Sequence, residues 1–184
     1  MRTAIASGKF TLHRISKTKF NSIKMDEITQ ALFAASRQGN VLVLKEIFLR
    51  KDNLDVYDEK GFTPLIIAAY NNQAEAVKAL LDAGVDSNKA DHSGNTALMG
   101  VCFKGYANIA RLLIERGANI NAQHGNGGTA LMFAAMFGRN GIVDLLIERG
   151  ADSTLTDLRS FSAADHAAQQ GNSAAVAKLQ ARQR

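Results

Sequence analysis

Apolar and polar positions along this chain recur with a period of 33 residues. A short segment of small and apolar residues opens each unit, and the clearest copies, TPLIIAA, TALMGVC and TALMFAA, begin at Thr63, Thr96 and Thr129. A more polar copy, SAADHAA, begins at Ser162, and a degenerate copy, QALFAAS, begins at Gln30. A fixed period of this length is typical of stacked repeats, in which each unit is one supersecondary element.

The opening segment of each unit predicts a short helix. Thr or Ser at its start offers a side-chain oxygen to the free N–H groups of the first turn, and Pro64 stands where a missing N–H costs least. A residue that tolerates the left-handed conformation follows, and we expect it to end the helix. The residues at that position are Gly39, Asn72, Gly105, Gly138 and Gly171.

A second helix is predicted from the apolar run that follows, and an Asn-, Asp-, Ser- and Gly-rich turn closes the unit. Each unit therefore reads helix, turn, helix, extended turn. A pair of short helices cannot bury its apolar face alone, so we expect neighbouring units to stack. The runs are AVKALL (76 to 81), IARLLI (109 to 114) and IVDLLI (142 to 147), and the glycines after them are Gly84, Gly117 and Gly150.

These residues and motifs resemble the ankyrin repeat family. The resemblance covers residues 26 to 184 and implies an all-α fold, an ankyrin-repeat solenoid of stacked helix-turn-helix units with extended turns. The segments that carry it are GFTPLIIAAYNNQAEAVKALLDAGVDSN (61 to 88), GNTALMGVCFKGYANIARLLIERGANIN (94 to 121) and GGTALMFAAMFGRNGIVDLLIERGAD (127 to 152). We expect a leader, 1 to 25, and five units: 26 to 59, 60 to 92, 93 to 125, 126 to 158 and 159 to 184.

The chain departs from the family signature at its histidine, which is replaced by Ile66, Met99 and Met132. Apolar packing between neighbouring units is therefore expected there. The two ends of the stack also differ. Asp165, Lys178 and Gln180 are polar residues in apolar or small-residue columns, as a terminal unit that faces water requires.

The first unit lacks such polar replacements, because Val41 and Leu42 stand in columns that hold small or polar residues elsewhere. We therefore expect an apolar surface at the N-terminal end of the stack. Our hypothesis is that part of residues 10 to 25 covers it. The residues that would do so are Phe10, Leu12, Ile15, Phe20 and Ile23.

The charge of the chain is concentrated in the leader. The formal charge is +5, but residues 1 to 24 contain six basic residues and no acidic one, so the remainder carries −1. Nucleic-acid contact is therefore an alternative for the leader and is not expected of the repeats. The leader itself is open to three interpretations: a tail or start-site artefact, a cap or partner contact, and a targeting segment.

Candidate chemistry is sparse. His92 and His124 lie on successive turns and could form a metal or pH-sensing pair, but we interpret them as solvated turn residues. Cys102 stands in a column of alanines, which favours a buried thiol over a nucleophile. The run GNGG (125 to 128) lacks the Lys-Ser/Thr of a phosphate-binding loop, so we expect its glycines simply to allow a positive φ. No catalytic, cofactor-binding or metal-binding residue is expected, and the apolar runs are too short to span a membrane.

The resemblance implies that a protein partner docks on the concave face, which the turn tips and the exposed side of the first helices form. Aromatic residues and Met are enriched at protein interfaces, and we expect Tyr70, Phe103 and Phe137 to be the anchors. The alternative is that these rings pack on the adjacent turn and are mostly covered. The predicted partner-binding residues are Phe62, Tyr70, Asn71, His92, Asn95, Phe103, Lys104, Asn126, Met136, Phe137, Arg159 and Phe161.

We therefore expect a non-catalytic protein–protein interaction module that acts as a cytoplasmic monomer. It would bind a protein partner and no small-molecule substrate. The alternatives are a regulatory or protective, inhibitor-like accessory protein for a partner enzyme, and nucleic-acid contact through the leader.

Overall fold

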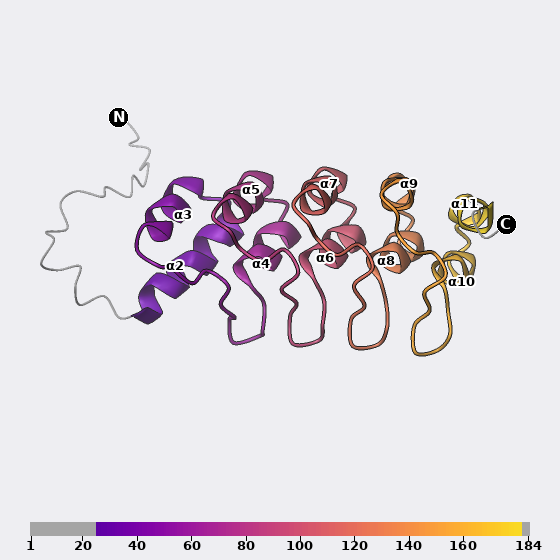
Figure 1. Ribbon diagram of the computed structural model, residues 1–184, viewed down its shortest axis with the longest axis horizontal. Helices are drawn as coiled ribbons and strands as arrows, with labels where there is room; N and C mark the ends of the chain where they lie inside the picture. Colours follow the sequence, from indigo (N-terminus) through magenta and orange to yellow (C-terminus); the bar gives the residue numbers. More distant parts are fainter. Residues whose placement is uncertain (1–24, 182–184) are drawn as a thin grey trace, which may run out of the picture.

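The computed structural model describes residues 25 to 181, and within this range the chain folds into ten helices and no strand. The helices form two parallel rows, with long loops that project from one side (Figure 1). The inner row consists of α2 (Met25–Gln38), α4 (Pro64–Tyr70), α6 (Ala97–Lys104), α8 (Ala130–Met136) and α10 (Ala163–Gln169). The outer row consists of α3 (Val41–Phe48), α5 (Ala74–Asp82), α7 (Ala107–Glu115), α9 (Asn140–Glu148) and α11 (Ser173–Ala181). The predicted all-α solenoid is confirmed.

The predicted helix caps are confirmed at α4, α6, α8 and α10, whereas α2 begins at Met25, before the degenerate copy that opens at Gln30. The hydroxyl of Thr63 accepts the backbone N–H of Ile66 at 3.1 Å, and the same bond recurs at α6 and α8. At α10, Ser162 and Asp165 form a reciprocal capping box. Each cap satisfies an N–H group that the helix cannot pair internally, so the period of the sequence becomes a period of helix starts.

The predicted left-handed positions are also confirmed. Asn72 has a φ of +59° and Gly138 a φ of +68°, each just after an inner helix. The expectation for the run GNGG is only partly right. Gly127 has a φ of +82°, whereas Gly128 is not in the left-handed region, and a Cβ there would clash with the imidazole ring of His124.

The core lies between consecutive helix pairs. Leu65, Leu98 and Leu131 are almost completely buried on the inner helices, as are Leu80 and Leu113 on the outer ones. The small residues of the inner helices allow close packing on the next pair. The column Ala69, Cys102 and Ala135 is fully buried, whereas Ala168 is exposed because no helix pair follows it.

The two ends of the stack differ as the sequence indicates. At the N-terminal end, Leu42 and Leu49 have 79% and 81% of their surface exposed. At the other end the predicted polar residues Asp165, Lys178 and Gln180 are exposed. The hypothetical cover by Phe10, Leu12, Ile15, Phe20 and Ile23 lies outside the described residues.

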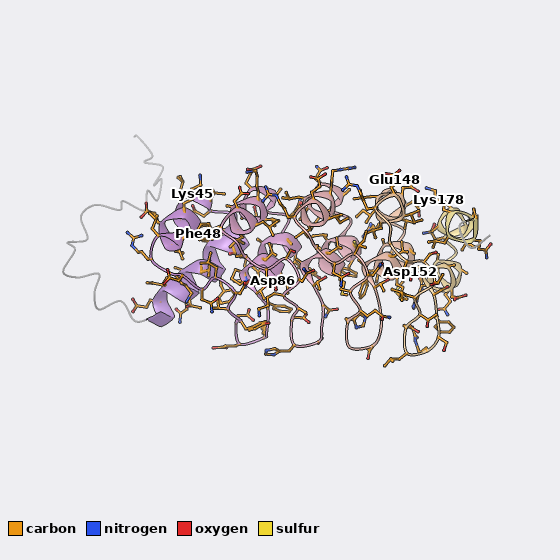
Figure 2. The ribbon with its side chains drawn as sticks, in the orientation of Figure 1. Lys45, Phe48, Asp86, Glu148, Asp152 and Lys178 are labelled. Atoms are coloured by element: carbon orange, nitrogen blue, oxygen red, sulfur yellow. The ribbon has the colours of Figure 1, made fainter. Side chains whose placement is uncertain are left out.

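Polar side chains tie each unit to the next. The carboxylate of Asp55 accepts the N–H of Asp86, and Oδ1 of Asn121 accepts the N–H of Asp152 at 2.8 Å. On the outer helices, Lys178 forms an ion pair with Asp144 at 2.6 Å. Figure 2 shows Lys178 on this outer row, together with Lys45 and Glu148. The stack is therefore held by directional bonds as well as by apolar contact.

None of the helices between residues 25 and 181 has the length and apolar character needed to cross a membrane.

Candidate binding surface on the inner helices and loops

A row of three aromatic rings crosses the ends of the inner helices. Tyr70 ends α4, Phe103 lies in the last turn of α6, and Phe137 follows α8. The rings of Tyr70 and Phe103 are stacked with centroids 6.3 Å apart, and Phe103 meets Phe137 edge to face at 4.5 Å. Both distances lie in the range of favourable aromatic pairs. We call these three residues the aromatic row.

The aromatic row is only partly covered. Tyr70 and Phe137 keep 44% and 41% of their surface exposed, and Phe103 is half-buried. The rings pack on one another and still face solvent, so they are not mostly covered. That they anchor a partner stays a prediction. Met136, which shares the 33-residue column of Tyr70 and Phe103, is half-buried and the neighbouring Phe137 continues the row instead.

Beside the aromatic row, a pocket of about 540 Å³ opens between α4, α6 and the loop before α6. Gly100, which lies inside α6, is part of the lining, so the helix presents only its backbone there. The volume is in the range of ordinary ligand sites. We call it the Gly100 pocket, and its apolar lining is Phe62, Ile66, Ile67, Tyr70, Met99, Phe103 and Phe133.

Cationic side chains border the aromatic row. Nζ of Lys104 lies 4.8 Å from the centroid of the Tyr70 ring, within cation–π range. Nε of Arg139 donates a hydrogen bond to the carbonyl of Phe103 at 3.2 Å. Arg37 lines the Gly100 pocket, and its guanidinium forms no ion pair with any side chain of residues 25 to 181. The helix side of this surface is therefore positive.

A second pocket, of about 430 Å³, lies between α8, α10 and the last two loops. Phe133 lines both pockets and so separates them. The ring of His124 lies against Phe133 at 5.5 Å, and Asp157 and His166 form part of the wall. The lining of this second pocket includes four ionisable side chains, those of His124, Asp157, Arg159 and His166.

His92 and His124 make contacts within the loops that carry them or with a neighbouring loop residue. Nδ1 of His124 accepts the N–H of Asn126 at 3.1 Å, in the position where Asp91 accepts the N–H of Ser93 in the previous loop. His92 packs on Tyr57 with ring centroids 5.7 Å apart. Within the described part of the chain, no group of three or more His, Cys, Asp or Glu side chains is placed to hold a metal ion.

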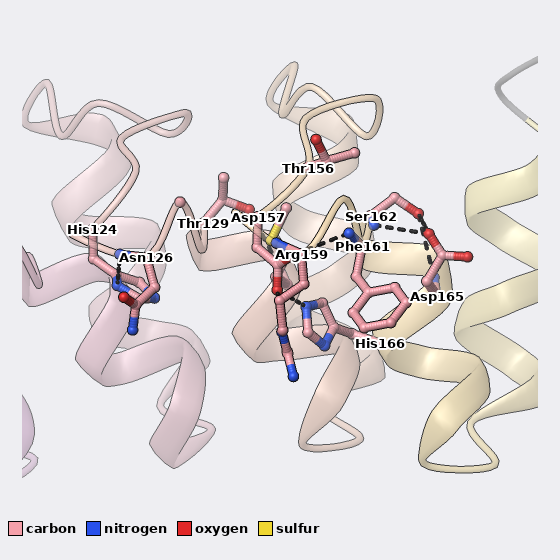
Figure 3. Close-up of polar contacts among 12 residues, drawn as sticks. His124, Asn126, Thr129, Thr156, Asp157, Arg159, Phe161, Ser162, Asp165 and His166 are labelled. Atoms are coloured by element: carbon pink, nitrogen blue, oxygen red, sulfur yellow. Dashed lines mark hydrogen bonds and ion pairs between the residues drawn. The ribbon is translucent and has the colours of Figure 1, made fainter.

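Among the ion pairs within residues 25 to 181, the most buried one is in the last loop. Nε2 of His166 lies 3.1 Å from Oδ2 of Asp157, and Oδ1 of Asp157 accepts the N–H groups of Arg159 and Phe161 (Figure 3). These bonds, first among them the one from Phe161, lower the pKa of Asp157 to about 2. The carboxylate is thus fully engaged in holding the loop against α10.

Cys102 is fully buried in α6, as predicted, and burial raises the pKa of its thiol. A thiol reacts as its thiolate, so this side chain is unreactive while the stack is closed.

The structure brings most of the predicted partner-binding residues to one surface. Phe62, Tyr70, Asn71, Asn95 and Phe103 line the Gly100 pocket, whereas Asn126, Met136 and Arg159 line the second pocket. Lys104 and Phe137 belong to the aromatic row and its border. The other two lie outside both linings: His92 packs on Tyr57, and Phe161 packs on His166.

Gly100 and Phe133 are the residues that sequence reasoning missed. The signal was present in the repeat, since Ile67, Gly100, Phe133 and His166 share one 33-residue column in which only Gly100 lacks a side chain.

Comparison with known proteins agrees with this architecture. A family model described as "Ankyrin repeats (3 copies)" matches residues 31 to 124, and one described as "Ankyrin repeats (many copies)" matches residues 102 to 147. Human Ankyrin repeat and SOCS box protein 3 is 37% identical over 54 residues, which is 29% of this chain and 10% of that protein. Delta-latroinsectotoxin-Lt1a from Latrodectus tredecimguttatus is 37% identical over 67 residues, which is 35% of this chain and 6% of that protein.

The chain thus matches about a tenth or less of the length of these relatives. The first family model alone covers about half of the chain, including Tyr70, Phe103 and all of the Gly100 pocket lining except Phe133. The chain belongs to the ankyrin repeat family.

Proposed function

We propose that this chain is a non-catalytic module that holds a protein partner against the inner helices and loops, with the aromatic row as its anchor. Ankyrin repeats are generally protein–protein interaction modules. The observation that carries the finer proposal is the aromatic row itself, in which Tyr70 and Phe137 remain more than two-fifths exposed although each packs on Phe103. Aromatic side chains with this partial exposure are typical anchors of protein interfaces.

The geometry favours binding without rearrangement. Each ring is positioned by its neighbour, and Lys104 and Arg139 are held over the same row by a ring contact and a hydrogen bond. The loops are linked to one another, because Gly125 donates to the carbonyl of Ser93 and Leu158 donates to that of Asn126. A surface that is ordered in advance loses little conformational entropy when a partner binds.

The test compares two sets of exposed apolar residues. A triple variant, Tyr70→Ala, Phe103→Ala and Phe137→Ala, removes the aromatic row. A control variant, Leu42→Ala and Leu49→Ala, removes apolar surface of even greater exposure from the end of the stack. Each protein is cross-linked in extracts of its native cell, and captured proteins are quantified by mass spectrometry.

We expect the triple variant to lose the partner that the unmodified chain captures, while the control retains it. A decrease of about tenfold or more corresponds to the loss of one or two well-packed aromatic anchors. Circular dichroism spectra of both variants check that the helices persist. Equal capture by the folded triple variant and the unmodified chain would rule out the aromatic row as the anchor.

A further inference from the structure

The strongest feature that the proposed function leaves unexplained is the glycine inside α6. Glycine in a helix interior is less favourable than alanine, because it loses more backbone entropy on folding. Packing does not require it at position 100: a Cβ built there would meet only Cδ2 of Tyr70, at an ordinary contact distance of 3.5 Å. The fold thus has room for a side chain at a position where the sequence has none.

The same helical position carries a large side chain in the two neighbouring units. Ile67 precedes Gly100 by one repeat, and Phe133 follows it by one repeat. These two side chains line the pocket on either side of the bare backbone of α6. The missing side chain therefore leaves the space between them open, and the apolar walls of the pocket suit a large apolar side chain.

The charges around the pocket favour an acidic occupant. Arg37 lines it without an ionic partner among the described residues, and Lys104 lies over the Tyr70 ring. The only acidic residue in the lining, Asp91, already accepts the N–H groups of Ser93 and Asn95. At the ends of the inner helices, the segments RQGN, YNNQ, FKGY, MFGR and QQGN contain no Asp or Glu.

The same charges argue against the leader as the occupant. Residues 1 to 24 contain six basic side chains and no acidic one, so they would bring positive charge to a positive surface. Like charges in a partly desolvated site repel, whereas an acidic segment would be attracted to it.

We propose that the Gly100 pocket receives one large apolar side chain from an extended segment of the partner, and that an acidic residue next to it on that segment pairs with Arg37. This inference rests on the proposed function and specifies the partner chemistry that the surface selects. The contacts with the aromatic row supply area, while the pocket and Arg37 supply the selectivity.

The experiment uses random short peptides displayed on phage and selected against the full chain. Selected peptides are then synthesised, and their affinities are measured for the variants Gly100→Phe, Gly100→Ala and Arg37→Glu. Gly100→Phe places in α6 the side chain that α8 carries as Phe133, and Gly100→Ala is the variant that folds even if the larger one does not. The matched controls are Gly141→Ala and Lys45→Glu. Gly141 is a helical glycine of the outer row with open space around it, and Lys45 is an exposed residue of α3.

We expect the selected peptides to share a large apolar residue with Asp or Glu beside it. Gly100→Phe should weaken their binding by about tenfold to a hundredfold, since burial of a Leu or Phe side chain contributes this much. Arg37→Glu should weaken it more than Lys45→Glu, and Gly141→Ala should leave it unchanged. Deletion of residues 1 to 24 should not weaken it either.

Two results would overturn the inference while leaving the proposed function intact. In the first, peptides bind and depend on the aromatic row, but Gly100→Phe and Gly100→Ala bind them as well as the unmodified chain does. In the second, the shared sequence is basic or lacks the apolar residue. The inference is also overturned if no peptide is enriched on the unmodified chain relative to the Gly100→Phe variant. Capture of the native partner tests the proposed function separately.

Discussion

Nε2 of His166 lies 3.1 Å from Oδ2 of Asp157, and both side chains are almost completely buried. An ionised carboxylate only accepts hydrogen bonds, so the ring nitrogen donates and the tautomer of His166 is determined by this contact. The bond joins the last loop to α10, nine residues further along the chain. It makes the loop part of the folded stack and so preserves the wall of the second pocket.

Asp157 should make the free energy of unfolding of the stack depend on pH in the acidic range. Its pKa is lowered from an ordinary 3.8 to about 2, so folding favours the ionised form. This stabilisation is complete above pH 3.8 and is lost as the pH falls toward 2. Asp157→Asn keeps an oxygen that can accept the N–H of Phe161 but cannot titrate. In urea denaturation across this range the unmodified chain should lose more stability than the variant. Parallel pH profiles would contradict the assignment.

Two glycines should respond in opposite directions to alanine. Gly100→Ala should raise the free energy of unfolding by about 0.5 to 1 kcal/mol, because the site is helical and has room. Gly138→Ala should lower the free energy of unfolding by about 1 to 2 kcal/mol, because the φ of +68° at Gly138 is in the left-handed region. A Cβ there would meet no atom within 4 Å, so the cost comes from the backbone conformation alone. Urea denaturation of the two variants measures both. A decrease in the free energy of unfolding for Gly100→Ala would contradict the finding that position 100 has room for a side chain.

The local elements were predictable from the sequence because their causes are local. A threonine cap such as Thr96 acts within three residues, and a left-handed residue such as Asn72 acts at its own position. The pocket was not predictable in this way. It depends on how far apart the stacking places Ile67 and Phe133, and on the turn of Tyr70 toward α6. The bond between His166 and Asp157 likewise depends on the path by which the loop returns.

The polar bonds between units should contribute measurably to stability. Oδ1 of Asn121 accepts the N–H of Asp152 across the boundary between two helix pairs. Asn121→Ala should lower the free energy of unfolding by about 1 kcal/mol, the net value of one such hydrogen bond. Asn108→Ala, an exposed position of α7, is the control and should have no such cost. Thermal and urea denaturation compare them, and equal behaviour would mean that the bond contributes nothing.

Cys102 should report opening of the stack. Because burial raises its pKa and excludes reagents, a maleimide should label it slowly in buffer and completely in denaturant. The comparison is a variant with Cys102→Ala and Ser173→Cys, which moves the thiol to an exposed position on α11. That thiol should react at once in buffer. Equally fast labelling of the unmodified chain would contradict the closed packing of α6.

The aromatic row crosses three consecutive helix pairs through two ring contacts, and each contact joins one pair to the next, as the other helix contacts in the stack do. In such an array, unfolding can begin at either end and spread inward. A partner that holds Tyr70, Phe103 and Phe137 together would link the central pairs into one cooperative unit. Amide protons of α4, α6 and α8 would then exchange together with a single free energy of opening, while α3 and α11 continued to open separately. The row would thus set how cooperatively the repeat array unfolds, in addition to where a partner binds.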